Sequence, residues 1–192
     1  MKKHNVIFLA LAAFAVMLTA CATPPTEEME RAHDAVIRAE NNADAVNYAP
    51  NTLIRARDAL TRMQGEADAR RFDAARNFAA EAVHLAERAI AEGGAGASHA
   101  RNEAIHLVDG LSAPLAQVSN ALNAARQVGG LDLDFDALSW DLDAARRSYN
   151  GARVSLEESY YNDAIAQAQN ARSILADISA GINHAAQLAG WK

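Results

Sequence analysis

The sequence predicts an all-α fold: an antiparallel helical bundle of about six helices, built from a duplicated helical hairpin with alanine-rich seams. Apolar residues recur alternately three and four positions apart over most of the chain, the spacing of one helix face. Alanine supplies 46 of the 192 residues, so these faces consist mainly of small side chains with the highest helix propensity. Each run spans only about three heptads before Gly or Pro interrupts it, which favours a folded-back bundle over one long coiled coil.

The first 20 residues have the pattern of a secretory signal peptide. Lys2 and Lys3 precede a nearly unbroken apolar run from Val6 to Leu18. The following Leu18-Thr19-Ala20-Cys21 resembles the lipobox of bacterial lipoproteins, whose cysteine receives diacylglycerol and becomes the mature N-terminus. The resemblance implies a covalent lipid on Cys21, joined by an acyl chain such as palmitate on its amino group. An ordinary signal peptide with a chance cysteine, or an uncleaved signal anchor, is the alternative.

The residues after Cys21 bear on location. Ala22 stands where an Asp would be the retention signal in enteric-type bacteria, so the resemblance implies the outer membrane and its periplasmic face. More than one acyl chain gives stable anchoring, because a single chain binds a membrane only marginally. Pro24 and Pro25 disfavour helix, and residues 21–26 are therefore predicted to form a short extended tether.

The first helical repeat is predicted over residues 27–92. Thr26 is a candidate N-cap, and acidic residues in the first turn suit the helix dipole. We expect one helix to run on past Val46 until Pro50 ends it. Two further helices are expected from the apolar spacing, one from Leu53 to Ala67 and the other from Phe72 to Ala89.

A Gly-rich linker is predicted at residues 93–98, followed by a second helical repeat over residues 99–192. The sequence Gly-Gly-Ala-Gly-Ala-Ser is small and flexible in isolation. Gly110 and Pro114 are expected to interrupt the next helix, and Gly129-Gly130 to end the one after it. Asp134 or Asp136 is expected to cap the following helix, and a last one covers Tyr161 to Ile182.

The two repeats align when the chain is shifted by 89 residues. Leu53 then falls on Leu142, Arg57 on Arg146 and Phe72 on Tyr161. Several alanines also coincide, although alanine-rich helices match one another easily. A duplicated hairpin is the preferred interpretation, and convergent heptad patterning is the alternative.

Residues 49–60 read A-P-x-x-L-x-x-A-x-x-A-L, and a helical hairpin is predicted after them. This arrangement resembles an uncharacterised family of alanine-rich bacterial lipoproteins. The resemblance covers residues 28–92 well and the second half only through the repeat. Some members carry a peptidoglycan-binding domain that has no counterpart up to Lys192. Because the family has no established activity, the resemblance implies location and fold but no active site.

Charge limits the classes of partner. The formal net charge is −6, and without Lys2 and Lys3 the mature chain has 16 basic and 24 acidic residues, a net charge of −8. Nucleic acid and anionic lipid both require clustered Lys and Arg, so neither is expected as a partner surface. Alanine seams bury little area per residue, which leaves a homo-oligomer possible.

Few residues suggest chemistry. His99, Glu103 and His106 share one helix face and are weak candidates for a metal site, although such spacing is common on solvated faces. The acids from Asp132 to Asp136 only partly match a calcium loop, and helix capping explains them better. No phosphate loop, nucleophile motif or paired carboxylates are evident, so we expect no enzyme and no cofactor beyond the lipid.

The expected function is that of a non-enzymatic scaffold or interaction module on the envelope, which binds another envelope protein or the cell wall. A carrier of a small molecule or metal ion, with its site between bundle helices, is the alternative. A tetratricopeptide-like solenoid is disfavoured by the 89-residue period.

Overall fold

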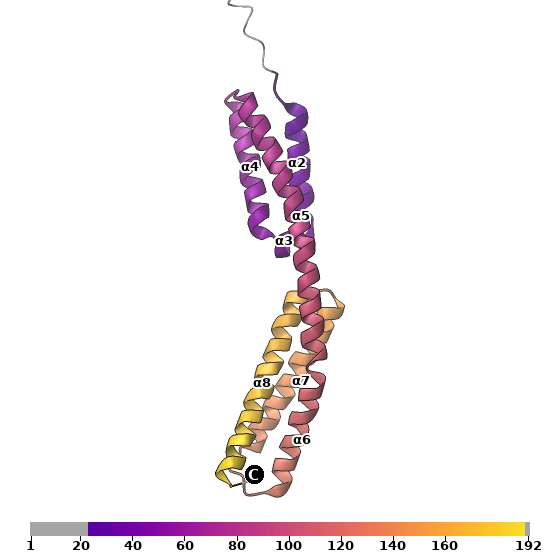
Figure 1. The fold of residues 1–192 in the computed structure, drawn as a ribbon, viewed down its shortest axis with the longest axis vertical. Helices are drawn as coiled ribbons and strands as arrows, with labels where there is room; N and C mark the ends of the chain where they lie inside the picture. Colours follow the sequence, from indigo (N-terminus) through magenta and orange to yellow (C-terminus); the bar gives the residue numbers. More distant parts are fainter. Residues whose placement is uncertain (1–22, 191–192) are drawn as a thin grey trace, which may run out of the picture. The chain divides into compact units, whose positions relative to one another are not determined.

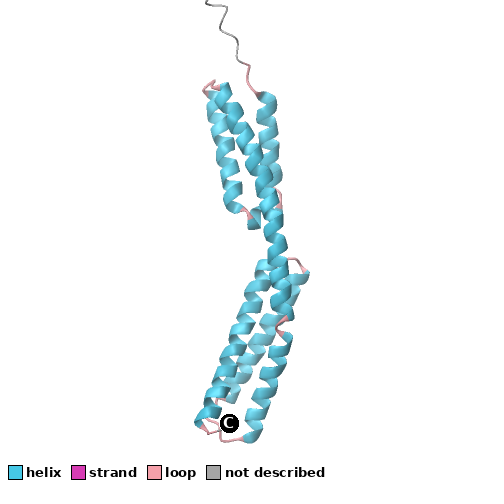
Figure 2. Ribbon diagram, viewed as in Figure 1, coloured by secondary structure: helices cyan, strands magenta, loops and turns pink. Residues whose placement is uncertain are grey.

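A computed structural model describes residues 23–190 of the chain, which divides into two compact units, Met1–Gly94 and Ala95–Lys192. The predicted signal peptide and Cys21 lie outside the described residues. Within them every regular element is a helix (Figures 1 and 2), which confirms the predicted all-α bundle. The helices are α2 Thr26–Glu40, α3 Ala43–Tyr48, α4 Pro50–Asp68, α5 Phe72–Asp109, α6 Ser112–Val128, α7 Phe135–Glu157 and α8 Tyr161–Leu188.

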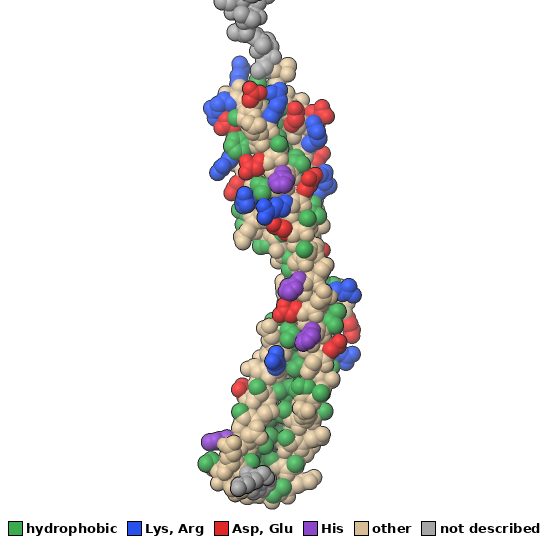
Figure 3. Space-filling view, in the orientation of Figure 1, with side chains coloured by type: hydrophobic (Ala, Val, Ile, Leu, Met, Phe, Trp, Pro, Cys, Tyr) green, Lys and Arg blue, Asp and Glu red, His purple; other side chains and the backbone are tan. Residues whose placement is uncertain are grey.

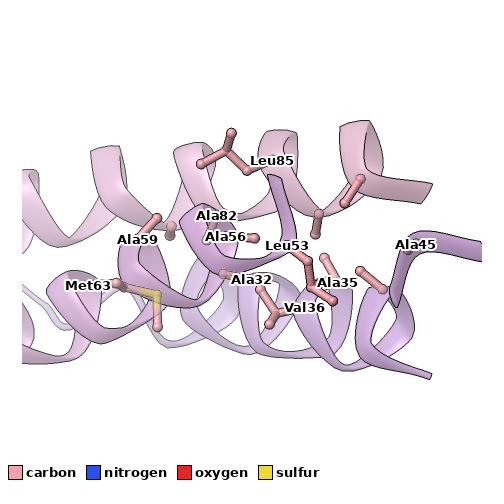
Figure 4. Packing of buried hydrophobic residues seen from close by; sticks show 14 of the residues in the cluster. Ala32, Ala35, Val36, Ala45, Leu53, Ala56, Ala59, Met63, Ala82 and Leu85 are labelled. Atoms are coloured by element: carbon pink, nitrogen blue, oxygen red, sulfur yellow. The ribbon is translucent and has the colours of Figure 1, made fainter. Parts of the chain in front are cut away.

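In unit 1, α2, α4 and the first part of α5 pack side by side, and α3 lies at one end of their core (Figures 1 and 4). The buried side chains come from positions three and four apart, as the sequence predicts. Because most of them are alanine, the helix axes can approach toward the short end of the usual range of about 8 to 10 Å. The core consists of Ala32, Ala35, Val36, Ala39, Ala45, Ala49, Leu53, Ala56, Ala59, Met63, Ala79, Ala82, Leu85, Ala86 and Ala89.

In unit 2, α6, α7 and α8 form the core together with the end of α5. Many of its buried side chains are larger than those of unit 1. Leu175 and Ile178, for example, stand 89 positions after Ala86 and Ala89 of unit 1. The core consists of Val108, Leu111, Val118, Leu122, Ala125, Leu131, Leu142, Ala145, Ala152, Ala168, Ala171, Leu175, Ile178, Ile182 and Ala185. Burial of branched side chains gives this unit more apolar area per residue than its alanine-rich counterpart.

The start and end of the first predicted helix are corrected by the structure. Thr26 is the first residue of α2 and not its N-cap, because the cap position is Pro25 and makes no side-chain bond. The helix then ends at Glu40 instead of continuing past Val46. The reason is Asn42, whose side chain accepts a hydrogen bond from the Ala45 amide at 2.8 Å and so begins the separate helix α3.

Residues 93–98, predicted as a Gly-rich linker between the repeats, are helical in the structure and form part of α5. Gly93 is buried, and a Cβ on it would lie 2.5 Å from the backbone nitrogen of Ala45. This glycine therefore permits close packing of α5 against α3. The division between the two units, at Gly94, falls within the same helical stretch.

The hairpin turn of unit 1 recurs in unit 2. Arg70 and Ser159, 89 positions apart, are the described non-glycine residues with positive φ, at 59° and 66°. The Arg71 amide donates to the Glu66 carbonyl and the Tyr160 amide donates to the Ser155 carbonyl, each at 2.8 Å. Both turns are thus the same Schellman-type helix ending. This shared geometry supports the hairpin repeat independently of alanine content.

A buried hydroxyl joins α4 to α5 in unit 1. Thr52 donates a hydrogen bond to Glu92 Oε2 at 2.5 Å, and Arg88 Nε donates to Glu92 Oε1 at 2.7 Å. The Thr52 bond chiefly, and then that from Arg88, hold the pKa of Glu92 below its usual value. The folded state therefore gains stability that is complete above the unfolded pKa of about 4.3 and is lost as pH falls through the folded pKa.

We expect Thr52→Val to raise the pKa of Glu92 toward its usual value and to weaken the acid sensitivity of unit 1. The difference in unfolding free energy between pH 6 and pH 3 should become smaller than in the unsubstituted chain, because the Glu92 contribution to it shrinks. Urea titrations at the two pH values measure this difference. Thr61→Val, on the exposed side of α4, is the control, and an equal change in both variants would contradict the assignment.

Candidate functional site

A groove of about 660 Å³ lies between α2 and α5 of unit 1. Its apolar floor is formed by Ala79, Ala80 and Val83 of α5. Small side chains at these positions leave room between the two helices. The charged and polar walls are formed by Glu28, Arg31, Asp34 and Arg38 of α2 and by Arg76, His84 and Glu87 of α5.

The helical period explains why these charges converge. Arg31, Asp34 and Arg38 are three and four residues apart, so they share the edge of α2 that borders the groove. The buried seam of α2 lies beside this edge and fixes it against α5. The groove is therefore held by core packing on one side while its charged walls remain in solvent.

Positive and negative side chains are balanced around the groove. Arg76 contacts Asp73 at 2.9 Å and Glu28 at 3.7 Å, while Arg31 contacts Glu27 at 3.5 Å. Within residues 23–190, Arg38 makes neither an ion pair nor a side-chain hydrogen bond. Figure 3 shows the interspersed red and blue side chains on the face of unit 1 that it presents. Such a surface is suited to a polypeptide that carries both signs of charge.

The lining of this groove favours binding over covalent chemistry. It contains a histidine, His84, but no hydroxyl or thiol among its lining residues that His84 could activate as a nucleophile. Of its carboxylates, Asp34 and Glu87 are exposed and Glu28 is partly exposed. The arrangement offers an apolar floor and charged anchors, which are the elements of a peptide or helix recognition surface.

The metal-site candidates lie elsewhere. His99, Glu103 and His106 are on the part of α5 that belongs to unit 2, and all three are exposed. In the part of the chain that the structure describes, no three His, Cys, Asp or Glu side chains are grouped so that they could hold a metal ion. Their common face is thus not a preformed site.

The aspartates after Gly130 act as the capping interpretation predicts. Asp134 is the N-cap of α7 and accepts a hydrogen bond from the Ala137 amide at 2.9 Å. Arg126 of α6 donates to the Phe135 carbonyl at 3.1 Å and to the Ser139 hydroxyl at 2.8 Å, which ties the start of α7 to α6. This segment is therefore structural.

Sequence patterns alone did not reveal the α2–α5 groove. Its walls come from residues separated by about 50 positions, and their meeting depends on which two helices of the bundle are neighbours. The usable signal was the run of alternating charges along one edge of α2, which resembles any solvated helix edge.

The fold and this groove define the class: an all-α bundle protein with an exposed groove between helices. Residues 27–105 match the model of a family described as a domain of unknown function, DUF4398. The match confirms the resemblance to an uncharacterised family over this segment, which contains α2, α3, α4, most of α5 and the whole groove. No curated protein and no solved structure matches the chain.

Among the described residues, no helix has both the length and the apolar character required to cross a membrane.

Proposed function

We propose that the chain is a lipid-anchored envelope lipoprotein on the periplasmic face of the outer membrane, and that its helical units act as a non-enzymatic interaction module. Cys21 carries the lipid. The groove between α2 and α5 binds a polypeptide of another envelope protein or of the cell wall. The observation that carries the binding part is this balanced, charge-walled groove with an apolar floor.

The anchoring part is supported by the sequence up to Cys21 together with the start of the first helix. The lipobox-like Leu18-Thr19-Ala20-Cys21 ends only five positions before α2 begins at Thr26. A tether of this length spans at most about 18 Å, at about 3.5 Å per residue. Unit 1 would accordingly be held within reach of the membrane surface, with its groove available to neighbouring envelope components.

The binding part is supported by the position of Arg38. Its guanidinium borders the groove and lacks an ion-pair partner among residues 23–190, unlike Arg31 and Arg76. An unpaired guanidinium can form a bidentate bond with a carboxylate of a bound peptide. Ala80 and Val83 would bury an apolar side chain of the same peptide.

A photoreactive amino acid at Ala80, which is exposed in the groove, tests the binding part in intact envelopes. We expect a discrete cross-linked adduct to a protein or to sedimentable cell wall. The same residue at Asp58, on the exposed side of α4, should give none. Arg38→Ala should reduce the Ala80 adduct at least about threefold, because a charge-assisted hydrogen bond contributes about 1.5 to 3 kcal/mol. Equal adducts from both positions, or none from either, would refute groove binding.

A further inference from the structure

The outer face of α8 in unit 2 is free of charged side chains. Eight exposed positions alternate four and three apart along it and hold only Ala, Ser, Asn and Gln. A helix face in solvent normally carries charges. The corresponding face of α5, 89 positions earlier, does so with Asp73 and Glu87. The eight positions on α8 are Asn162, Ala166, Gln169, Ser173, Ala176, Ala180, Asn183 and Gln187.

Figure 3 shows the same contrast, with a largely green and tan surface over α6 and α8 of unit 2. The other helix of the unit, α7, holds seven charged residues in its 23 positions, whereas α6 holds only Arg126 in its 17. The charges of unit 2 are thus concentrated away from α6 and α8. A surface without charge can approach a second negatively charged chain without like-charge repulsion.

Three charged side chains border the uncharged face: Asp163 near the start of α8, and Arg172 and Asp177 near its middle; the imidazole of His184 follows on the edge of Asp177. Arg172 lies at one edge, where it lines the groove between α6 and α8. Asp177 lies at the other edge by the helical period, and both are exposed. Neither forms an ion pair or side-chain hydrogen bond with any residue from 23 to 190. In a parallel two-stranded coiled coil with heptad positions a to g, a residue at position g of one helix contacts the residue at position e, five positions later, of the other helix. Arg172 and Asp177 have this spacing.

We infer that a second copy of this chain packs in parallel against the outer face of α8, with Arg172 of each copy paired to Asp177 of the other. A two-fold axis along α8 generates this pair twice, since such an interface is self-complementary. The parallel direction rests on the proposed function, because copies anchored through Cys21 in one membrane point the same way.

The available area fits this occupant. The 28 residues of α8 extend over about 42 Å. At a helix diameter of about 11 Å, α8 alone offers about 460 Å² per copy, so the adjoining edges of its neighbouring helices must complete a standard interface of about 800 Å² per copy. Alanine and serine along its centre allow the two helix axes to approach closely. The amides at Asn183 and Gln187 can donate and accept across the two-fold axis.

A charge swap tests the pairing in the full mature chain, extracted in detergent and measured by sedimentation equilibrium. Arg172→Glu and Asp177→Arg should each raise the dimer dissociation constant at least about tenfold, because each creates like-charge contacts. The double variant R172E/D177R should restore the constant to within about threefold, since the pair re-forms with exchanged partners. Arg153→Glu on α7 makes the same change of charge outside the face and should have no effect. Circular dichroism verifies that every variant keeps its helices.

Cysteine cross-linking in membranes tests the direction. Ser173→Cys and Ala180→Cys should each form a disulfide-linked dimer, because a parallel two-fold axis places each residue beside its own copy. Asn150→Cys on α7 should not. A monomeric unsubstituted chain, single charge variants without effect, or adducts only to a different protein would each overturn the inference. The mass of the N-terminal peptide that contains Cys21, measured in the same samples, shows whether the lipid is attached. A chain without lipid is thus distinguished from a lipidated chain that does not dimerise.

Discussion

Gly93→Ala is expected to destabilise unit 1 by about 3 kcal/mol, the upper part of the range for overpacked sites. In an open helix the same change would be favourable, because alanine exceeds glycine in helix propensity by about 1 kcal/mol. Here the new Cβ would meet the backbone of α3, 2.5 Å from the Ala45 nitrogen and 2.6 Å from the Asp44 carbonyl carbon. Backbone atoms cannot rotate away as a side chain does, so α3 and α5 must separate. Urea unfolding of the mature chain, followed by circular dichroism, measures the loss.

Gly94→Ala is the matched control for this prediction. No described atom lies within 4 Å of the position where its Cβ would be. It should therefore stabilise the chain by up to about 1 kcal/mol through helix propensity alone. The two adjacent substitutions are thus expected to act in opposite directions. If both stabilise, Gly93 is not in close contact with α3; if both destabilise, residues 93–98 need glycine for flexibility, as the sequence alone suggested.

Ile178→Ala should destabilise unit 2 by about 3 kcal/mol, within the range of about 2 to 5 kcal/mol for large-to-small changes in a core. Ile178 is 1% exposed and is one of the largest fully buried side chains. Its neighbours on the buried seam, Leu175 and Ile182, are themselves packed in the core and can fill the cavity only in part. The unfolding midpoint in urea should fall with little change in slope.

Val154→Ala in the same unit is the control, because Val154 is 52% exposed on α7. Its cost should stay below about 0.5 kcal/mol, as for most surface substitutions. A comparable loss from both variants would show that Ile178 does not occupy a tightly packed core. A small loss from Ile178→Ala alone would lead to the same conclusion.

The helices themselves could be predicted from the sequence because their signals are local. The spacing of apolar residues located α4, α6, α7 and α8, and the structure confirms Gly129 as the end of α6 and Asp134 as the cap of α7. Pro50 marks a helix boundary as well, but as the first residue of α4 and not as the end of the first helix. The errors have different causes. Asn42 begins α3 through a local cap bond to the Ala45 amide, a signal that the apolar spacing does not contain. Gly93 lies inside α5 in contact with α3, and local propensity carries no information about contacts between helices.

The groove could not be predicted for the same reason. The charges on α2 follow an ordinary solvated pattern, and they line a groove only because α5 packs beside them. The outer face of α8 is different, because it can be found from the sequence. Ala164, Ala168 and Leu175 identify the buried side of this helix, and the residues on its opposite, exposed side lack charge. Sequence reasoning had located the seam but had not compared its two sides.

Intact mass spectrometry of the mature chain from purified outer membranes tests the central proposal most directly. We expect a polypeptide that begins at Cys21 and exceeds the mass of residues 21–192 by a diacylglyceryl group and one further acyl chain. In the Cys21→Ser variant this added mass should be absent, whereas Ala22→Ser should retain it. An unmodified N-terminus, or a membrane-bound chain that still begins at Met1, would contradict the proposed lipid anchor.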